Sequence, residues 1–424
     1  MRISQNWIPR KTREMLSDNS GAALMMAIFA MTMLLAIAMD MLFETNVEVQ
    51  VSSQSINQVK AYYAAKAGVD ISLLRIHIYK KALGMIGSAL PNKSMLDPIW
   101  QMPFAWPPIV PATASGIDQG DIKKSVKESL MTSTYIATID SESSKLDIND
   151  LGSSNQLLSQ TVHTQLMQMF QSRIDGDEKF AARYRGFDFN SVLNNIGDWV
   201  DADKQGRNGG DESAPYSDRP NSQYLPPNAP FKTLSELHEV AGVTDEIYSL
   251  LEPRITIYGA KGVNVNYAGK QVLMSLSPDI TAERAEKILE GRQDPNRGPF
   301  KDLADFTKFL NTLGISGDPF KSTSKDNSNG KDADADAKLA LIFDPEFNFR
   351  IKSQGTAGKV TKEITAIVYD TAKIKERMKL FQPTPPPTPP PLSNQQKPPA
   401  QSATPSPTPG SDTSKPNIVY WNET

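Results

Sequence analysis

The longest apolar stretch of the chain lies near its N-terminus. Residues 22–39 are all apolar except Thr32, and a helix of this length spans about 27 Å, close to the thickness of a bilayer core. No proline interrupts residues 10–90, and apolar residues keep recurring at helical spacing beyond the apolar stretch. The pattern predicts one long helix, with a transmembrane half at 22–43 and an amphipathic half at 44–90.

Alternating apolar and polar positions further along the chain predict two β-hairpins. Their segments are 135–139 with 145–149, and 347–352 with 363–369. Residues 151–310, between the hairpins, follow the period of helices instead. The two clearest amphipathic sets are Leu157, Val162, Leu166 and Phe170, and then Val192, Ile196, Trp199 and Val200. We therefore expect an α+β fold, in which the long helix packs on an antiparallel sheet that carries a large inserted all-α domain.

Three segments have the composition of loops or linkers. The first, at 91–120, is rich in Pro, Gly and small polar residues around a few aromatic side chains. Residues 311–340 are hydrophilic and predict a mobile loop. From Pro383 onward the chain holds 13 of its 31 prolines, which predicts an extended, disordered tail over 373–424. The apolar end of this tail, Ile418 to Trp421, is either a chance cluster or a docking motif.

This division of the chain leaves the sheet in two parts, 91–150 and 341–372, on either side of the inserted domain. The basic residues before position 21 predict a cytoplasmic N-terminal end, so everything after residue 44 is expected on the opposite, periplasmic side of the membrane.

Composition argues against an enzyme. The net charge is −3 and the chain has no cysteine and only three widely spaced histidines, so a zinc site is improbable. No G-x-S-x-G, P-loop or H-E-x-x-H pattern occurs. Since the fold has no disulfide, another stabilising link is expected.

Two cleavage patterns compete at the N-terminus. A secretory signal peptide cut after Ala38 is suggested by the sequence Ala-Ile-Ala that ends there. The alternative is a leader, residues 1–21, cut after Gly21 so that the mature chain begins at Ala22 and keeps its apolar segment. The uninterrupted helical pattern favours the leader cut after Gly21. A single helix that is half transmembrane and half amphipathic is typical of pilins. An ordinary membrane anchor followed by an unrelated helix is the remaining alternative.

Several motifs resemble, in their order along the chain, the K-type minor pseudopilins of bacterial type II secretion. The motifs are Ser144–Asn149, Gly197–Asp201, Pro227–Phe231 with Ser235–Leu237, Val263–Asn266 and Gly298–Phe300. The resemblance covers about residues 15 to 372. It implies a pilin-like fold and a non-enzymatic subunit that works with other minor pseudopilins at the tip of the pseudopilus shaft. It further implies processing by prepilin peptidase, an inner-membrane anchor, and a role in exporting folded substrates across the outer membrane.

Met26 supports this resemblance. It is the fifth residue after the proposed cleavage, where most pilins have a glutamate that pairs with a neighbour's N-terminal amine, and K-type subunits lack that glutamate. A subunit with nothing stacked above it has no amine to neutralise, and a lone carboxylate in lipid is costly. A minor pilin of a related type IV pilus-like assembly is the alternative.

A nucleic-acid-binding protein is a more remote alternative. Residues 237–243 and 263–306 resemble helix-hairpin-helix units, which hold phosphate on backbone amides. However, the second unit has Pro278 and Asp279 at its turn, and residues 231–310 hold 10 Lys and Arg against 12 Asp and Glu. Phosphate binding needs the opposite balance, so no nucleic acid is expected as a partner.

Residues 201–212 have the spacing of a calcium-binding loop. Asp201 and Asp203 take the first and third positions, Gln205 the fifth, and Glu212 the twelfth, with a glycine at the sixth. Two further candidate ligands are Asp198 and Asp211. Calcium would be the missing structural link, and the resemblance also implies calcium in this region. A loop of solvated acids is the alternative.

Overall fold

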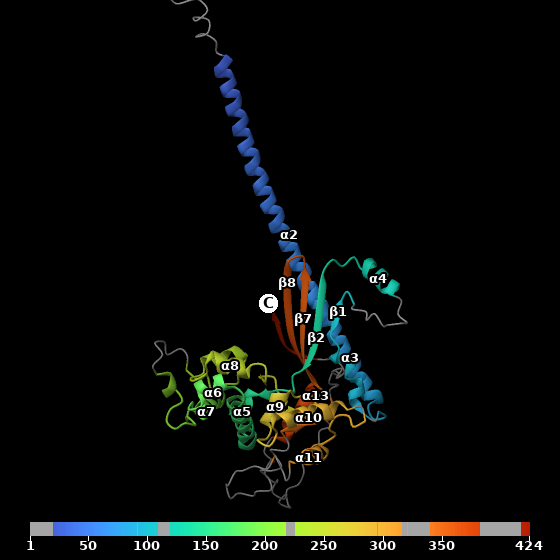
Figure 1. Cartoon of the computed structure of the whole chain (residues 1–424), viewed down its shortest axis with the longest axis vertical. Coiled ribbons are helices and arrows are strands. Elements are labelled where there is room, and N and C mark those ends of the chain that lie inside the picture. Colours follow the sequence, from blue (N-terminus) through green and yellow to red (C-terminus); the bar gives the residue numbers. More distant parts are fainter. Residues whose placement is uncertain are drawn as a thin grey trace, which may run out of the picture.

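The computed structural model describes residues 20–90, 92–108, 119–217, 225–294, 296–315, 320, 340–381 and 417–424. Its most prominent element is the helix α2 (Ser20–Ile86), which is 67 residues long. Figure 1 shows α2 standing out as a long rod, with only its C-terminal part packed against the rest of the chain. The prediction of one continuous helix is confirmed.

A five-stranded antiparallel sheet lies against this C-terminal part of α2 (Figure 1). Its strand order is β1-β2-β7-β8-β9. The strands are β1 (Phe104–Trp106), β2 (Thr134–Ser141), β7 (Asn348–Ala357), β8 (Val360–Tyr369) and β9 (Asn417–Glu423). The hairpin predicted from 347–352 and 363–369 is confirmed as β7 and β8, which are longer than expected and turn at Gly358.

The helix and the sheet approach each other closely because two positions have no side chain. A Cβ atom on Gly68 would lie 2.2 Å from Ser353 Oγ, and one on Gly355 would lie 2.1 Å from the carbonyl oxygen of Ala61. Around these glycines α2 and the sheet share an apolar core, which includes Val69, Ile76, Tyr79, Trp100, Ile139, Phe349, Ile351, Ile364, Ala366 and Val368. Burial of this surface fixes the helix on the sheet.

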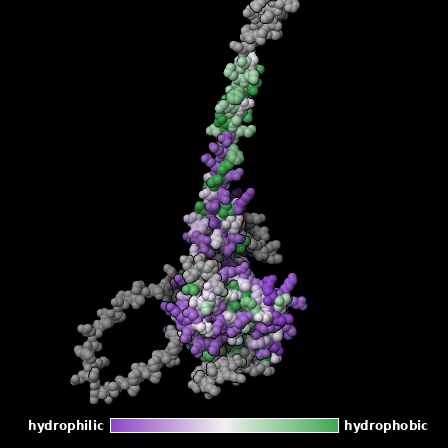
Figure 2. All heavy atoms as spheres, turned by 90° about the vertical axis from the view of Figure 1, so that its left-hand side faces the viewer, coloured by the Kyte–Doolittle hydropathy of each residue, from purple (hydrophilic) through white to green (hydrophobic). Residues whose placement is uncertain are grey.

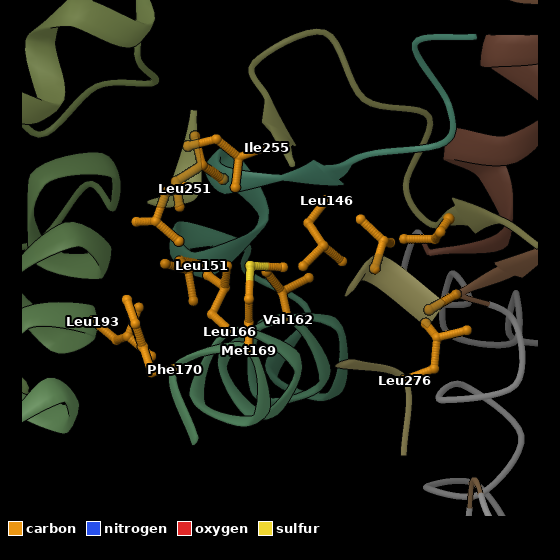
Figure 3. Close-up of a cluster of buried hydrophobic side chains, with 14 of the residues drawn as sticks. Leu146, Leu151, Val162, Leu166, Met169, Phe170, Leu193, Leu251, Ile255 and Leu276 are labelled. Carbon is orange, nitrogen blue, oxygen red and sulfur yellow. The ribbon is translucent and has the colours of Figure 1, made fainter. Parts of the chain in front are cut away.

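The chain between β2 and β7 forms a separate, mainly helical block. Its helices are η2 (Ile148–Gly152), α5 (Gln156–Gly176), α6 (Glu178–Tyr184), α7 (Phe189–Val200), η3 (Ala214–Tyr216), η4 (Leu234–Glu239), α8 (Asp245–Leu251), α9 (Lys270–Ser275), α10 (Ala282–Gln293) and α11 (Leu303–Thr312). Figure 3 shows side chains of α5, among them Val162, Leu166 and Met169, pointing toward Leu146 and Leu151. This block has its own apolar core, distinct from that under the sheet.

Buried carboxylates hold the block to the sheet where the chain crosses between them. Glu346 accepts hydrogen bonds from the hydroxyls of Ser141 and Ser143, and from the N–H of Asn348 at 2.8 Å. Glu142 pairs with the guanidinium of Arg350. Because buried charges are stable only with such partners, the two crossings are held in a fixed geometry.

The prediction of an all-α inserted domain is wrong in detail, because the block contains short strands. They form two parallel two-stranded pairs: β3 (Leu146–Asp147) with β4 (Ile255–Thr256), and β5 (Val263–Asn264) with β6 (Leu341–Ile342). The hairpin predicted from 135–139 and 145–149 is also wrong. β2 pairs with β7, and residues 146–147 leave the sheet to join β4, since local alternation does not specify a strand's partner.

Two segments expected to lack structure are partly ordered. Within 91–120 lie η1 (Lys93–Leu96), α3 (Pro98–Gln101), β1 and the start of α4 (Gln119–Glu128), because Trp100 is buried against Tyr79 and Phe349. Within 373–424 the helix α13 (Thr371–Leu380) continues to residue 380, and residues 417–423 form β9. Most of the loop predicted at 311–340 lies outside the described residues, as do residues 382–416.

Candidate metal centre

Helix α7 places the first carboxylates of the predicted calcium loop. Asp188 caps its N-terminus, and its apolar face is buried in the core of the inserted block. Asp198, in its last turn, is therefore drawn into the interior. The helix ends at Val200, and the N–H of the following C-cap residue, Asp201, donates to the carbonyl of Gly197 at 3.0 Å.

The loop after α7 turns back on itself. The N–H of Gly206 donates to the carbonyl of Gly210 at 3.0 Å, and Gln205 and Asp211 form one antiparallel bridge. Gly209 and Gly210 have φ values of +89° and +85°, a region that glycine enters without strain. This tight return brings Glu212 back beside the end of α7.

Three of the predicted ligands come together. Carboxylate oxygens of Asp201, Asp203 and Glu212 lie within 4.8 Å of one another. Asp203 is exposed and Asp201 is half-buried, whereas only 4% of Glu212 is exposed. The cluster is thus open to solvent on the side of Asp203 and closed on the side of Glu212.

Each of the two less exposed carboxylates has one oxygen without a hydrogen-bond partner among the described residues. These atoms are Asp201 Oδ1 and Glu212 Oε1, both buried. The second oxygens are engaged: Asp201 Oδ2 accepts from the guanidinium of Arg207 at 2.9 Å, and Glu212 Oε2 accepts from Asn228 Nδ2 at 3.1 Å. A buried carboxylate oxygen without a donor is costly unless a cation approaches it.

The electrostatics also indicate a cation. Burial, and next the charge of Asp201, raise the pKa of Glu212 to about 7. Burial is also the main cause that raises the pKa of Asp198 to about 6, to which the charges of Asp201 and Asp203 add. Arg207 offsets part of this negative charge by contacting Asp201 and, at 3.5 Å, Asp198.

The other predicted ligands are placed differently. Both carboxylate oxygens of Asp198 accept the N–H of Arg207 at 3.1 Å. Asp211 is exposed, and its carboxylate accepts the N–H of Ser213 at 2.7 Å, so it lies outside the three-residue cluster. Gln205 is exposed and donates its N–H to Asp203.

Sequence reasoning missed Arg207 and Asn228 as parts of this site. Asn228 contacts Glu212 and also the carbonyl of Asp203, and it adopts a positive φ of 51°. The sequence offers one signal for Asn228. It lies between Pro227 and Pro230, and prolines this close together indicate a turn.

The donor set fits calcium. Calcium prefers six to eight oxygen ligands, and three clustered carboxylates with unpartnered oxygens supply hard, anionic donors. Asp201, Asp203 and Glu212 are the residues that would hold the ion. The ion would neutralise their mutual repulsion and join the end of α7 to the loop.

At the N-terminus the structure describes the chain only from Ser20, so most of the predicted leader lies outside the described residues. Gly21 and Ala22 are exposed in the first turn of α2, and Met26 is 68% exposed. Figure 2 shows hydrophobic residues covering this outer part of α2, in contrast to the hydrophilic surface of the body. The outer part of α2 is long and apolar enough to cross a membrane.

Comparison with protein families gives two adjoining matches over the inserted block. Residues 144–260 match the first domain of "Type II secretion system (T2SS), protein K", and residues 263–326 match a second model with the same description. The chain belongs to the type II secretion protein K family. The carboxylate cluster of this family member lies within the first matched segment.

Comparison with solved structures also gives a match. It is a chain in the crystal structure of the GspK-GspI-GspJ complex from the type 2 secretion system of enterotoxigenic Escherichia coli. The identity is 13% and the TM-score 0.42, over 69% of this family member and 80% of the solved chain. No curated protein sequence matches significantly.

Proposed function

We propose that the chain is a structural minor pseudopilin at the tip of a type II secretion pseudopilus. In this role it is a pilin-like subunit anchored once in the inner membrane, with its body in the periplasm. It assembles with other minor pseudopilins and supports export of folded proteins across the outer membrane. Membership of the protein K family supports this role.

The observation that carries the proposal is the two-part surface of α2. Large apolar side chains are exposed along its outer part, among them Leu24, Phe29, Leu35 and Phe43, and the most apolar window has a mean hydropathy of 2.4 with no part buried. So much apolar surface requires cover by lipid or neighbouring helices. The inner part of the same helix packs on the sheet, so one element serves both anchorage and folding.

N-terminal processing tests this proposal directly. We expect the protein extracted from membranes to begin at Ala22, as measured by N-terminal sequencing, and Gly21→Val to accumulate as precursor because prepilin peptidase requires a small residue before the cut. Ser20→Val, one residue further from the cut, is the matched control and should be processed. A mature start at Met39 would remove the membrane anchor and with it the proposed role.

We further propose that Asp201, Asp203 and Glu212 bind a structural calcium ion in the inserted block. The unpartnered oxygens of Asp201 and Glu212 support this proposal, as does the raised pKa of Glu212. Because only the folded block brings these carboxylates together, binding adds to the stability of the folded state.

Metal removal tests the calcium proposal. At a free calcium concentration a hundredfold above Kd, binding stabilises the fold by about 2.7 kcal/mol, so a chelator should lower the melting temperature and calcium should restore it better than magnesium. Asp201→Asn and Glu212→Gln should abolish this difference. Asp211→Asn is the matched control in the same loop and should respond as the wild type does. An unchanged melt with chelator, together with no metal by elemental analysis, would leave only a loop of solvated acids.

A further inference from the structure

The C-terminal half of β8 has the composition of an aggregation-prone strand. Residues 364–369 read Ile-Thr-Ala-Ile-Val-Tyr, without charge, glycine or proline. Such β-branched and aromatic segments pair readily with other chains when they lie at an open sheet edge. Within β8 the charged residues, Lys362 and Glu363, lie before this run, and Asp370 directly follows the strand.

β9 covers this uncharged run and ends where the charges begin. It pairs antiparallel with β8 from Tyr369, opposite Asn417, to Ile364, opposite Glu423. The ladder closes at Glu363 and Thr424, whose backbone groups exchange two hydrogen bonds of 2.9 Å. Strand β9 therefore shields the long uncharged run of β8.

Side-chain contacts make this pairing specific. Trp421 packs against the core shared by α2 and the sheet. The ring centroid of Tyr420 lies 5.3 Å from that of Tyr258 in the inserted block. Glu423 accepts hydrogen bonds from the hydroxyl of Tyr62 at 3.1 Å and from Trp421 Nε1 at 2.7 Å. The strand thus contacts α2, the sheet and the inserted block.

β9 is itself a better-protected edge than β8. It spans 7 residues, whereas β8 spans 10, and its pairing shifts register between Ile367 and Val368. Pro416 directly precedes it and Glu423 lies near its end. Short length, a bulge, a proline and a charge are the features that discourage edge-to-edge pairing.

We propose that residues 417–424 are an intrachain protective strand, and that the edge of β8 is a binding site for one extended peptide strand of this kind. With β9 bound, the edge at 364–369 cannot pair with a strand of another molecule. The connection through residues 382–416 makes the binding intramolecular. Because both strands belong to one chain, pairing within the chain needs no encounter between molecules and is favoured over pairing between chains at micromolar protein.

Cleavage of the folded protein tests this proposal. A specific protease recognition sequence is inserted between Gln401 and Ser402 of the full chain, and the detergent-solubilised protein is cut after folding. At micromolar concentration the freed strand is no longer held to its own chain, so it can dissociate and leave the edge of β8 open. We expect the cut protein to self-associate in sedimentation velocity, and a labelled peptide of residues 417–424 to bind it and reverse the association. The uncut chain should exclude the peptide.

A proline pair in the uncut chain provides the matched control. In an antiparallel ladder, successive N–H groups of a strand point alternately toward and away from the partner strand. The N–H of Thr424 donates to the carbonyl of Glu363 in β8. The N–H of Asn422 therefore also points to β8, and that of Glu423 points away. Asn422→Pro should therefore admit the peptide and self-associate, whereas Glu423→Pro should do so much less. Cut protein that keeps the size distribution of the uncut chain and binds no peptide would overturn the proposal, as would an uncut chain that is already a strand-exchanged dimer.

Discussion

Glu212 shows how one buried carboxylate links pH to stability. Its pKa is raised to about 7 in the folded chain, from an ordinary value of 4.5, first by burial and then by the charge of Asp201. Between pH 4.5 and about pH 7, the Glu212 carboxyl group therefore holds its proton more tightly in the folded state than in the unfolded state. The contribution of Glu212 to stability is therefore greatest at low pH and falls as pH rises toward 7.

We expect this pH dependence to appear in the metal-free protein. Glu212→Gln should melt at a higher temperature than the wild type at pH 7.5, because the neutral amide is not repelled by Asp201, and the two should converge below pH 4.5, where Glu212 is protonated in both the folded and the unfolded state. Calcium should reverse the order at pH 7.5, since the amide cannot replace the charged ligand. Melting temperatures with chelator and with calcium measure both effects. A difference between the two proteins that does not change with pH would contradict this role of Glu212.

At the scale of elements, the contact between α2 and the sheet depends on the absence of a side chain at Gly68. A Cβ there would lie 2.2 Å from Ser353 Oγ and 2.9 Å from Tyr135 Cδ2, whereas a Cβ on Gly84 of the same helix meets nothing within 4 Å. The two positions share the helical preference for alanine over glycine, which is worth about 0.5–1 kcal/mol. They differ in the contact with the sheet.

Gly84→Ala should therefore stabilise the protein by about 0.5–1 kcal/mol. Gly68→Ala should destabilise it by about 1–3 kcal/mol, because overpacking forces neighbouring groups apart. Denaturant unfolding of the detergent-solubilised chain, followed by tryptophan fluorescence, measures both changes. Equal effects of the two substitutions would mean that α2 does not pack on the sheet at Gly68.

At the scale of the whole molecule, Met26 tests the proposed tip position. Met26→Glu places a carboxylate at the position of the pilin glutamate. In a pilin that has another subunit stacked above it, the N-terminal amine of that subunit neutralises the glutamate. If nothing is stacked above, the charge stays unpaired in lipid at a cost of about 2.5–3.5 kcal/mol or more. We expect Met26→Glu to impair secretion and co-purification with other minor pseudopilins.

Met25→Glu is the matched control, since the neighbouring side chain is also exposed on α2. At the tip both acids lack a partner, so both variants should impair secretion to a similar extent. Normal secretion by Met26→Glu together with failure of Met25→Glu would show that a neighbour's amine lies above residue 26. That outcome would exclude the tip.

The sequence by itself determined those features for which a local pattern of residues is compatible with only one local structure. An apolar run long enough to span a bilayer, followed without proline by apolar residues at helical spacing, predicts one long helix, and α2 is one element. Alternation on both sides of a Gly-containing turn gave the hairpin of β7 and β8, and the helical period gave α5 and α7. The spacing of Asp201, Asp203 and Glu212 was sufficient to predict that a returning loop would bring them together.

Tertiary structure decided the partners. Nothing local distinguishes a strand that pairs with its neighbour in sequence from β2, which pairs with β7 more than 200 residues later, so the first predicted hairpin was wrong. The same holds for Arg207 and Asn228, whose roles depend on where the loop folds back. The C-terminal residues 417–424 were ambiguous for the same reason. Whether a short apolar end becomes a strand depends on an open sheet edge, and only the assembled fold supplies that edge.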